Sequence, residues 1–150
     1  MRFLPQLSLH GPFGSLTVSE EDEGLVALDW GWGGDQQQTD LLRRAREQLH
    51  AYFDRELREF DLPLAPQGSA FQRAAWRAFG SVAFGSTCTC LELGSRCGID
   101  PRALGRARSL NPLPILIPSH RLVGPRRPRA FIPEGTADTA RFLIDLERNP

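Results

Sequence analysis

Residues 101–121 read PRALGRARSLNPLPILIPSHR, and their pattern dominates the fold that we expect for the second half of the chain. The first ten of them predict a helix, because proline is tolerated at the first helical position and the Asn111-Pro112 step ends a helix. Upstream, Thr89 is suited to cap another helix, and Gly98-Ile99-Asp100 predicts the turn between the two. Two helices joined by a short glycine-containing turn form the helix-turn-helix pattern.

The end of the same segment carries the candidate reactive residues. The apolar run Ile115-Leu116-Ile117 predicts a short buried strand that stops at Pro118. Because proline restricts the backbone, we expect the side chains of Ser119 and His120 to be held rigidly. Glu147, on the last predicted helix, is a candidate to orient the His120 imidazole through its second ring nitrogen. The alternatives are a buried histidine with satisfied hydrogen bonds and a solvated carboxylate.

The rest of the second half also predicts helices. Ser69 is suited to cap a helix from Ala70 to about Phe79, and a last helix is expected after Thr136. Apolar residues at helical spacing predict the buried faces of these two helices: Phe71, Ala74, Ala75, Ala78, Phe142, Leu143 and Leu146.

The first third of the chain predicts strands followed by one helix. Apolar and polar residues alternate in three segments that turn signals separate: Gln6–His10, Ser15–Ser19 and Leu25–Trp30. Thr39 is then suited to cap a helix that reaches Phe53. We therefore expect an α/β N-terminal domain over residues 1–63, a short antiparallel sheet plus a helix. A mostly helical, helix-turn-helix domain of winged-helix-like type is expected over residues 64–150.

The two halves carry opposite charge, although the formal net charge of the chain is zero. Residues 1–63 hold 6 Arg and 12 Asp or Glu, and residues 64–150 hold 12 Arg and 6 Asp or Glu. Between Arg96 and Arg129 there are 8 Arg and a single acidic residue, Asp100. A basic half indicates an anionic partner, and arginines on the second helix of a helix-turn-helix indicate DNA. General replacement of Lys by Arg explains the absence of Lys but not this clustering.

Composition argues against several classes of protein. With 150 residues, of which 41% are hydrophobic and 24% charged, the chain can bury a core. No apolar run approaches the roughly 18 residues of a membrane span, and no secretory signal is recognisable. Cys88, Cys90 and Cys97 are an odd number of thiols, so we expect a reducing compartment, the cytoplasm. They lack a convincing fourth ligand, so we expect no metal and no cofactor.

Taken together, the motifs resemble the O6-alkylguanine-DNA alkyltransferase family, the methylated-DNA–protein-cysteine methyltransferases. The resemblance covers almost the whole chain. Residues 62–76 resemble the family's entry into its C-terminal domain, and Arg102-Ala103-Leu104-Gly105 resembles the start of its recognition helix. Residues 111–121 resemble its signature, which contains Pro-Cys-His-Arg and is the most specific of these motifs.

The resemblance implies a mechanism in DNA repair. Members bind double-stranded DNA through the minor groove, rotate the alkylated guanine out of the stack and move its alkyl group onto a cysteine. On this pattern Arg102 fills the vacated base position, Asn111 fixes the turn, and His120 with Glu147 activates the acceptor at position 119. Further DNA contacts are expected from Thr89, Cys90, Ala103, Gly105, Arg106, Arg121, Arg126 and Arg127. The base pocket is expected to include Pro118, Phe131 and Ile132.

The sequence departs from the family at the acceptor, because Ser119 stands where the signature has cysteine. Displacement at a saturated carbon needs a soft, polarizable anion. A thiol ionises readily next to a histidine, whereas a serine hydroxyl does not. Serine acts in acyl transfer with the help of an oxyanion hole, which the transfer of an alkyl group does not offer. We therefore expect negligible alkyl transfer.

Other positions depart as well, and they bear on the choice among functions. Cys90 stands where the family usually has tyrosine, Phe131 offers no hydroxyl to a base, and Arg106 replaces a small residue. These changes favour a natural lesion sensor, a monomer that associates with the nucleoid when it binds and passes damage to excision-repair proteins. The alternative is an active methyltransferase captured as an engineered Cys-to-Ser variant.

Two further functions are weaker alternatives. A helix-turn-helix regulator would bind a particular DNA sequence rather than a lesion. A serine hydrolase is disfavoured, because no glycine-rich oxyanion loop precedes Ser119.

Overall fold

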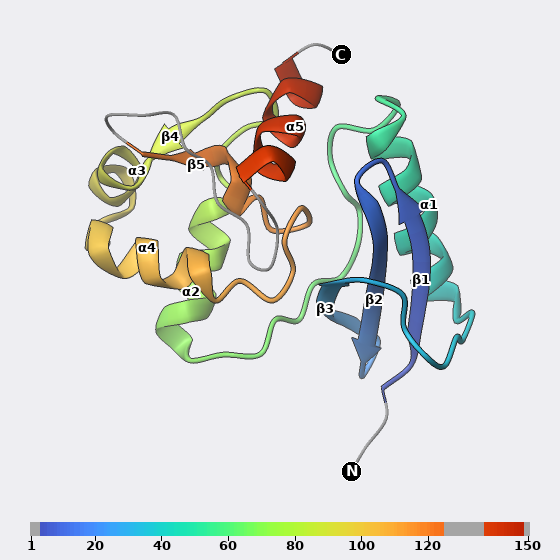
Figure 1. Ribbon diagram of the computed structural model, residues 1–150. Coiled ribbons are helices and arrows are strands. Elements are labelled where there is room, and N and C mark those ends of the chain that lie inside the picture. The colour runs from blue at the N-terminus through green and yellow to red at the C-terminus, as the bar shows by residue number, and fades with distance from the viewer. Residues whose placement is uncertain (1–3, 125–136, 149–150) are drawn as a thin grey trace. The chain divides into compact units, whose positions relative to one another are not determined.

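The computed structural model describes residues 4–124 and 137–148. It divides the chain into two compact units, Met1–Gln67 and Gly68–Pro150 (Figure 1). The first unit holds a sheet and a helix, and the second is mostly helical, which confirms the predicted fold class.

The first unit is an antiparallel three-stranded sheet with one helix packed on it. Its elements are β1 (Gln6–Gly11), β2 (Gly14–Glu21), β3 (Gly24–Trp30) and α1 (Asp40–Phe53). The strands pair in the order β1-β2-β3, and α1 contacts β1 and β2. The Thr39 side chain caps α1 by accepting a hydrogen bond from the Leu42 amide at 3.1 Å. The unit's core includes Leu9, Leu16, Val18 and Leu28 of the sheet and Leu42, Ala45, Leu49 and Tyr52 of the helix.

The second unit is built from helices and one very short parallel sheet. Its elements are α2 (Ala70–Phe79), β4 (Cys88–Thr89), α3 (Cys90–Cys97), α4 (Pro101–Ser109), β5 (Leu122–Val123) and α5 (Ala137–Arg148). A single 3-10 turn, Ser119–Arg121, precedes β5. Its helix α4 packs against both α2 and α3, and α5 packs against the 3-10 turn.

Capping residues determine where α3 and α4, the two helices of the helix-turn-helix, begin and where the chain turns between them. The Thr89 side chain caps α3 by accepting from the Glu92 amide at 3.1 Å, and Asp100 caps α4 by accepting from the Arg102 amide at 2.9 Å. Gly98 ends α3 in the left-handed conformation, with φ of 70°. The turn is tight, because a Cβ added at Gly94 would lie 2.4 Å from the Ile99 carbonyl oxygen.

A buried tryptophan links α2 to α4. Trp76 Nε1 donates a hydrogen bond to the Ala107 carbonyl at 2.9 Å. We expect Trp76→Phe to lower the free energy of unfolding by about 2 kcal/mol, because it deletes this bond and leaves a void. Urea denaturation of the full chain measures the change. Phe71→Leu on the exposed face of the same helix is the control, with an expected change within about 0.5 kcal/mol. If Trp76→Phe and the unchanged chain were equally stable, the stabilising role of Trp76 between α2 and α4 would be contradicted.

Two sequence predictions about the second unit are wrong. Residues 115–117 are buried but form no strand: Pro114 and Ile117 make only an isolated bridge, and Ile115 has φ of 74°. The physical reason is that the flanking prolines lack an N–H, so the segment cannot support a ladder. Phe71 and Phe142 do not join the core, because they are 47% and 40% exposed.

The parallel pairing of β4 with β5 is a feature that the sequence did not predict. Cys88 pairs with Leu122 and Thr89 pairs with Val123. This pairing holds the start of α3 beside the segment that follows the 3-10 turn. It therefore positions the helix-turn-helix relative to Ser119 and His120.

Candidate functional site

The candidate site is built around the 3-10 turn and lies inside the second unit. Ser119 and His120 have no exposed surface, and Glu147 of α5 is 3% exposed. Asn111, just after α4, is also buried. Four polar side chains in a core are costly unless they are hydrogen-bonded, so their contacts define what the site can do.

Asn111 fixes the loop that carries Ser119. Its Oδ1 accepts a hydrogen bond from the Leu113 amide at 2.9 Å, and its Nδ2 donates to the Ile117 carbonyl at 2.9 Å. The same Nδ2 donates to Ser119 Oγ at 3.1 Å. One amide group therefore closes the turn after α4 and orients the Ser119 hydroxyl.

A carboxylate on α5 holds both residues that follow Ser119. Glu147 Oε2 lies 2.8 Å from His120 Nε2. The Arg121 guanidinium binds the same carboxylate in a bidentate manner, with Nε to Oε1 at 2.9 Å and Nη2 to Oε2 at 3.0 Å. Arg121 Nη1 also donates to the Val82 carbonyl at 2.8 Å. The bidentate geometry makes this a strong, directional ion pair.

The charge states of the pair follow from burial and these contacts. Burial tends to raise the pKa of Glu147, but the hydrogen bonds from His120 and Arg121 outweigh it and lower the pKa to about 2. Burial lowers the pKa of His120, although Glu147 opposes the shift. At neutral pH the site therefore holds a carboxylate and a neutral imidazole.

The neutral imidazole is left with one nitrogen that can accept a proton. Its Nε2 carries the hydrogen that it donates to Glu147, so Nδ1 has the lone pair. Nδ1 is buried and has no hydrogen-bond partner among the described residues. A buried acceptor of this kind, oriented from behind by a carboxylate, has the features of a general base.

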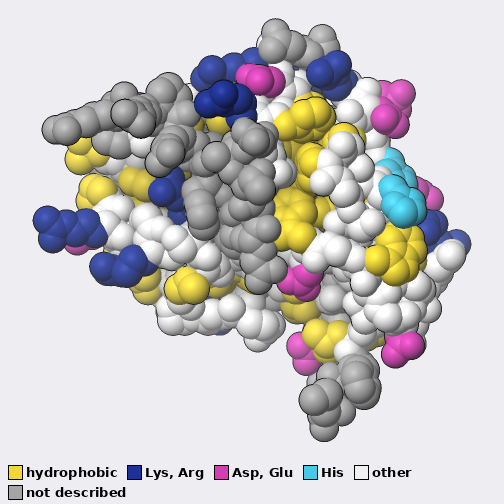
Figure 2. All heavy atoms as spheres, viewed as in Figure 1, with side chains coloured by type: hydrophobic (Ala, Val, Ile, Leu, Met, Phe, Trp, Pro, Cys, Tyr) yellow, Lys and Arg dark blue, Asp and Glu magenta, His cyan; other side chains and the backbone are white. Residues whose placement is uncertain are grey.

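The predicted DNA-contacting residues of α4 divide into exposed and buried ones. Arg102 and Arg106 are exposed, and Gly105 has open space around it. Basic side chains lie on the surface over α4 in Figure 2. Ala103 was expected to contact DNA, but it is buried, so its side chain packs inside the unit.

Arg121 was expected to contact DNA, and the structure gives it an internal role instead. It is 8% exposed, and its guanidinium is committed to Glu147 and the Val82 carbonyl. Among the other predicted residues, Pro118 is buried, and Thr89 and Cys90 lie at the start of α3. Arg126, Arg127, Phe131 and Ile132 lie outside the described residues.

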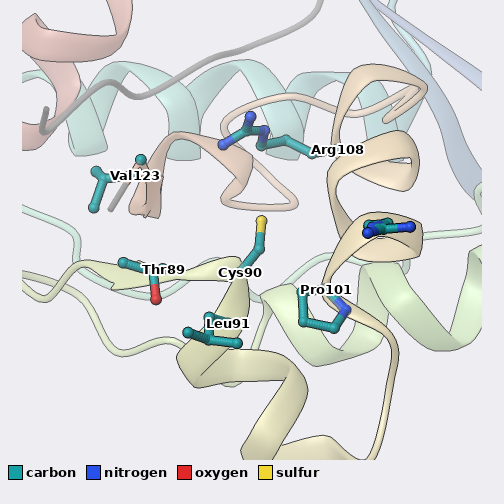
Figure 3. A pocket seen from close by; sticks show the side chains of 8 residues that line it. Thr89, Cys90, Leu91, Pro101, Arg108 and Val123 are labelled. Carbon is teal, nitrogen blue, oxygen red and sulfur yellow. The ribbon is translucent and has the colours of Figure 1, made fainter. Parts of the chain in front are cut away.

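A pocket of about 290 Å³ opens where α3, α4 and β5 meet (Figure 3). Its lining residues are Thr89, Cys90, Leu91, Pro101, Arg102, Arg108, Val123 and Gly124. Sequence reasoning singled out Thr89, Cys90 and Arg102 but missed Arg108, because nothing in the pattern of α4 distinguishes an arginine that turns into a cavity from one that faces water.

Metal-ligating clusters and membrane-spanning helices are both absent from the described residues. These residues contain no group of three or more His, Cys, Asp or Glu side chains placed to hold a metal ion. None of the described helices is long and apolar enough to cross a membrane. The three cysteines are free thiols.

Both units match models of one protein family. Residues 8–66 match the ribonuclease-like domain of 6-O-methylguanine DNA methyltransferase, and residues 70–149 match its DNA binding domain. A methylated-DNA–protein-cysteine methyltransferase of Methanosarcina barkeri is 33% identical over 151 residues, which are 94% of this chain and 95% of the relative.

Solved structures show the same fold. The crystal structure of the Mycobacterium tuberculosis O6-methylguanine methyltransferase matches with a TM-score of 0.85 and 28% identity, over 97% of this chain and 93% of that one. The crystal structure of Mycobacterium tuberculosis OGT in complex with DNA matches with a TM-score of 0.82 and the same identity and coverage.

Proposed function

Because this chain belongs to the 6-O-methylguanine DNA methyltransferase family, we propose that it recognises O6-alkylguanine in double-stranded DNA without taking up the alkyl group. The observation that carries the proposal is the hydroxyl of Ser119, which occupies a buried position inside an otherwise complete array of Asn111, His120 and Glu147. An oxygen there keeps the architecture of the site and removes the soft nucleophile.

The chemistry of the site supports recognition without transfer. A neutral His120 with a free lone pair on Nδ1 can assist the ionisation of a thiol, whose ordinary pKa is near 8.5. It is far too weak a base to maintain a serine alkoxide. Attack at a saturated carbon also generates no oxyanion that backbone amides could stabilise. The bond between O6 and the alkyl carbon therefore stays intact.

The α3–α4 helix-turn-helix supplies the DNA-binding surface in this proposal. The exposed arginines of α4 contact the phosphates and the groove, while the open space at Gly105 lets the helix backbone approach. Turning a base out of the stack costs a few kcal/mol, and Arg102 offsets this cost by filling the vacated position. A lesion that weakens base pairing lowers the cost further, which is one source of selectivity.

The resulting protein is a sensor that marks damage for other proteins. On this proposal it acts as a monomer in the cytoplasm, associates with the nucleoid when it binds and passes the lesion to excision-repair proteins. The second candidate is an active methyltransferase in which Ser119 replaces a native cysteine. The intact contacts of Asn111, His120 and Glu147 favour this candidate, because a single exchange would leave them unchanged.

We expect the chain to bind a duplex with a central O6-methylguanine at least about tenfold more tightly than the same duplex with guanine. Fluorescence anisotropy at one fixed salt concentration measures both affinities. Equal affinities for several unrelated sequences would overturn lesion recognition. A strong preference for one sequence, with or without the lesion, would favour the regulator instead.

Two arginine variants separate base replacement from phosphate contact in the same assay. Arg102→Ala should lower the affinity for the lesion duplex more than for the unmodified duplex, because Arg102 fills a gap that exists only after the base has turned out. Arg106→Ala is the matched control on the same helix. It should weaken binding to both duplexes equally and reduce the salt dependence.

A further inference from the structure

The first unit carries a tryptophan at its surface, on the loop that follows β3 and crosses to β1 (Figure 1). Trp32 is 55% exposed. Its indole stacks on the exposed imidazole of His10 in β1, with ring centroids 4.8 Å apart and an angle of 27° between the ring planes. Tryptophan is among the residues that contribute most to protein–protein binding, so this exposed pair is a candidate contact for another protein.

Hydrogen bonds to the sheet hold the loop that carries Trp32. The Gly33 amide donates to Ser8 Oγ at 2.9 Å, and Gln36 Nε2 donates to the same oxygen at 3.0 Å. Gln36 Oε1 also accepts from the Ser8 amide at 2.7 Å. The Ser8 hydroxyl is itself 2.8 Å from Thr17 Oγ1 of β2. The loop is therefore ordered before any partner binds, which lowers the entropy cost of a contact with Trp32.

The charge of the first unit indicates which kind of partner suits this surface. The unit holds 6 Arg and 12 Asp or Glu. Asp35 is exposed on the loop of Trp32, between Gly33 and Gln36, the two residues that bind Ser8. DNA phosphates repel an acidic unit, so we expect its surface to stay accessible when the second unit binds a duplex. A cationic protein segment has the complementary charge.

We propose that the stacked pair of Trp32 and His10 is the docking surface for an arginine-bearing segment of another protein, the one to which the lesion is passed. The proposal rests on the proposed function, since a sensor needs a contact surface that DNA leaves accessible. A planar guanidinium stacks on an indole face better than the strongly hydrated ammonium of lysine does, and Asp35 attracts either cation. A second copy of this chain fits less well, because its exposed arginines on α4 contact DNA in the proposed function.

Peptide binding to the full chain tests the docking surface. The probes are three labelled peptides in which serine alternates with arginine, with lysine or with glutamate, and fluorescence anisotropy measures their affinities. We expect the arginine peptide to bind about fivefold more tightly than the lysine peptide and the glutamate peptide not to bind. Equal affinities for the arginine and lysine peptides would overturn the proposal, and this result needs no variant to fold.

Two variants separate stacking from charge in the same assay. Trp32→Ala should abolish the preference for arginine over lysine, because only the indole distinguishes the two cations. Asp35→Asn should weaken the binding of both peptides by one factor, about twofold, and keep the preference. A preference for arginine that survives in Trp32→Ala would overturn the proposal.

Matched controls remove the same chemical groups elsewhere. Phe71→Ala removes an exposed aromatic side chain from the second unit and should leave both peptide affinities unchanged. Glu47→Gln removes an exposed carboxylate from α1, which packs on the face of the sheet that carries Leu9 rather than His10. It should weaken peptide binding less than Asp35→Asn does. Control variants that weaken binding as much as the loop variants would show non-specific attraction and overturn the proposal.

The failure of docking can be distinguished from the failure of lesion recognition. Trp32→Ala should bind the O6-methylguanine duplex as tightly as the unchanged chain does, and a loss would place Trp32 on DNA and overturn the proposal. Selectivity for arginine without any preference for the lesion would sustain the docking surface and reject the lesion sensor. A preference for the lesion without selectivity among the peptides would do the reverse. Sedimentation velocity completes the test, because dimers that Trp32→Ala dissociates would assign the surface to a second copy.

Discussion

Ser119→Cys should convert the protein into a stoichiometric methyl acceptor. After incubation with a duplex that contains O6-methylguanine, we expect the intact mass of this variant to rise by one methyl group, while the unchanged chain stays at its original mass. We expect the rates of transfer to differ by more than about 10³-fold, because a thiolate is a strong nucleophile at neutral pH and a serine hydroxyl is not.

The contacts already present at the site explain why exchanging the Ser119 oxygen for sulfur should be enough to permit methyl transfer. Asn111 Nδ2 already lies 3.1 Å from the oxygen that sulfur would replace, and His120 is already oriented by Glu147 at 2.8 Å. In the step itself the new sulfur–carbon bond forms as the bond from carbon to O6 breaks. The thiol proton is taken up by way of solvent at Nδ1 of His120, which has no direct hydrogen bond to position 119, and a proton then returns to the guanine anion to give unmodified guanine. No other reagent is needed.

Peptide mapping is an essential part of this experiment, because the chain has thiols at Cys88, Cys90 and Cys97. The methyl group must be found at position 119. Ser119→Ala is the control that lacks a nucleophile at position 119 and should still bind the lesion duplex. A methyl group on Ser119 of the unchanged chain would refute the chemical argument. A Ser119→Cys protein that binds the lesion but gains no methyl would show that the site has lost more than its sulfur.

The parts of the fold that depend on three or four neighbouring residues could be predicted from the sequence. Ser69 caps α2 and Thr89 caps α3, as expected, and Gln72 completes a reciprocal capping box with Ser69. Such caps are local, so the sequence contains all the information. The 115–117 segment shows the limit of local signals, since three apolar residues are compatible with a strand and with a buried loop.

The parts that could not be predicted depend on contacts between distant segments. The two-residue strands β4 and β5 are too short to leave a pattern, and they are defined only by their pairing. Arg121 and Arg108 belong to a cluster of arginines whose composition indicates DNA. In the structure Arg121 binds Glu147, and Arg108 lines a pocket. A cluster of charged residues indicates the sign of the partner's charge, but it does not indicate which of the side chains face the partner.

Glu147→Gln should be the most destabilising single change in the site. The carboxylate compensates the charge of Arg121 through two hydrogen bonds and orients His120, all with almost no solvent access. Removing one partner of a buried ion pair leaves the other charge uncompensated and costs roughly 3–5 kcal/mol. Urea denaturation at neutral pH measures the loss. Glu92→Gln, at an exposed carboxylate of the same unit, should stay within about 0.5 kcal/mol.

The loss of stability caused by Glu147→Gln should depend on pH in a way that a general folding defect would not. The pKa of Glu147 is lowered from 4.5 to about 2 in the folded protein, so its contribution is complete above pH 4.5 and is lost as the pH falls toward 2. The shift corresponds to about 3 kcal/mol. Burial also lowers the pKa of His120, so stability already begins to decline as the pH falls below 6.5. The difference in stability between the unchanged chain and Glu147→Gln should therefore shrink steeply only below pH 4.5. If this difference in the free energy of unfolding stays constant down to acid pH, the carboxylate is not the ionised partner of Arg121. If the variant does not fold, a free energy of unfolding of the unchanged chain that does not fall at acid pH leads to the same conclusion.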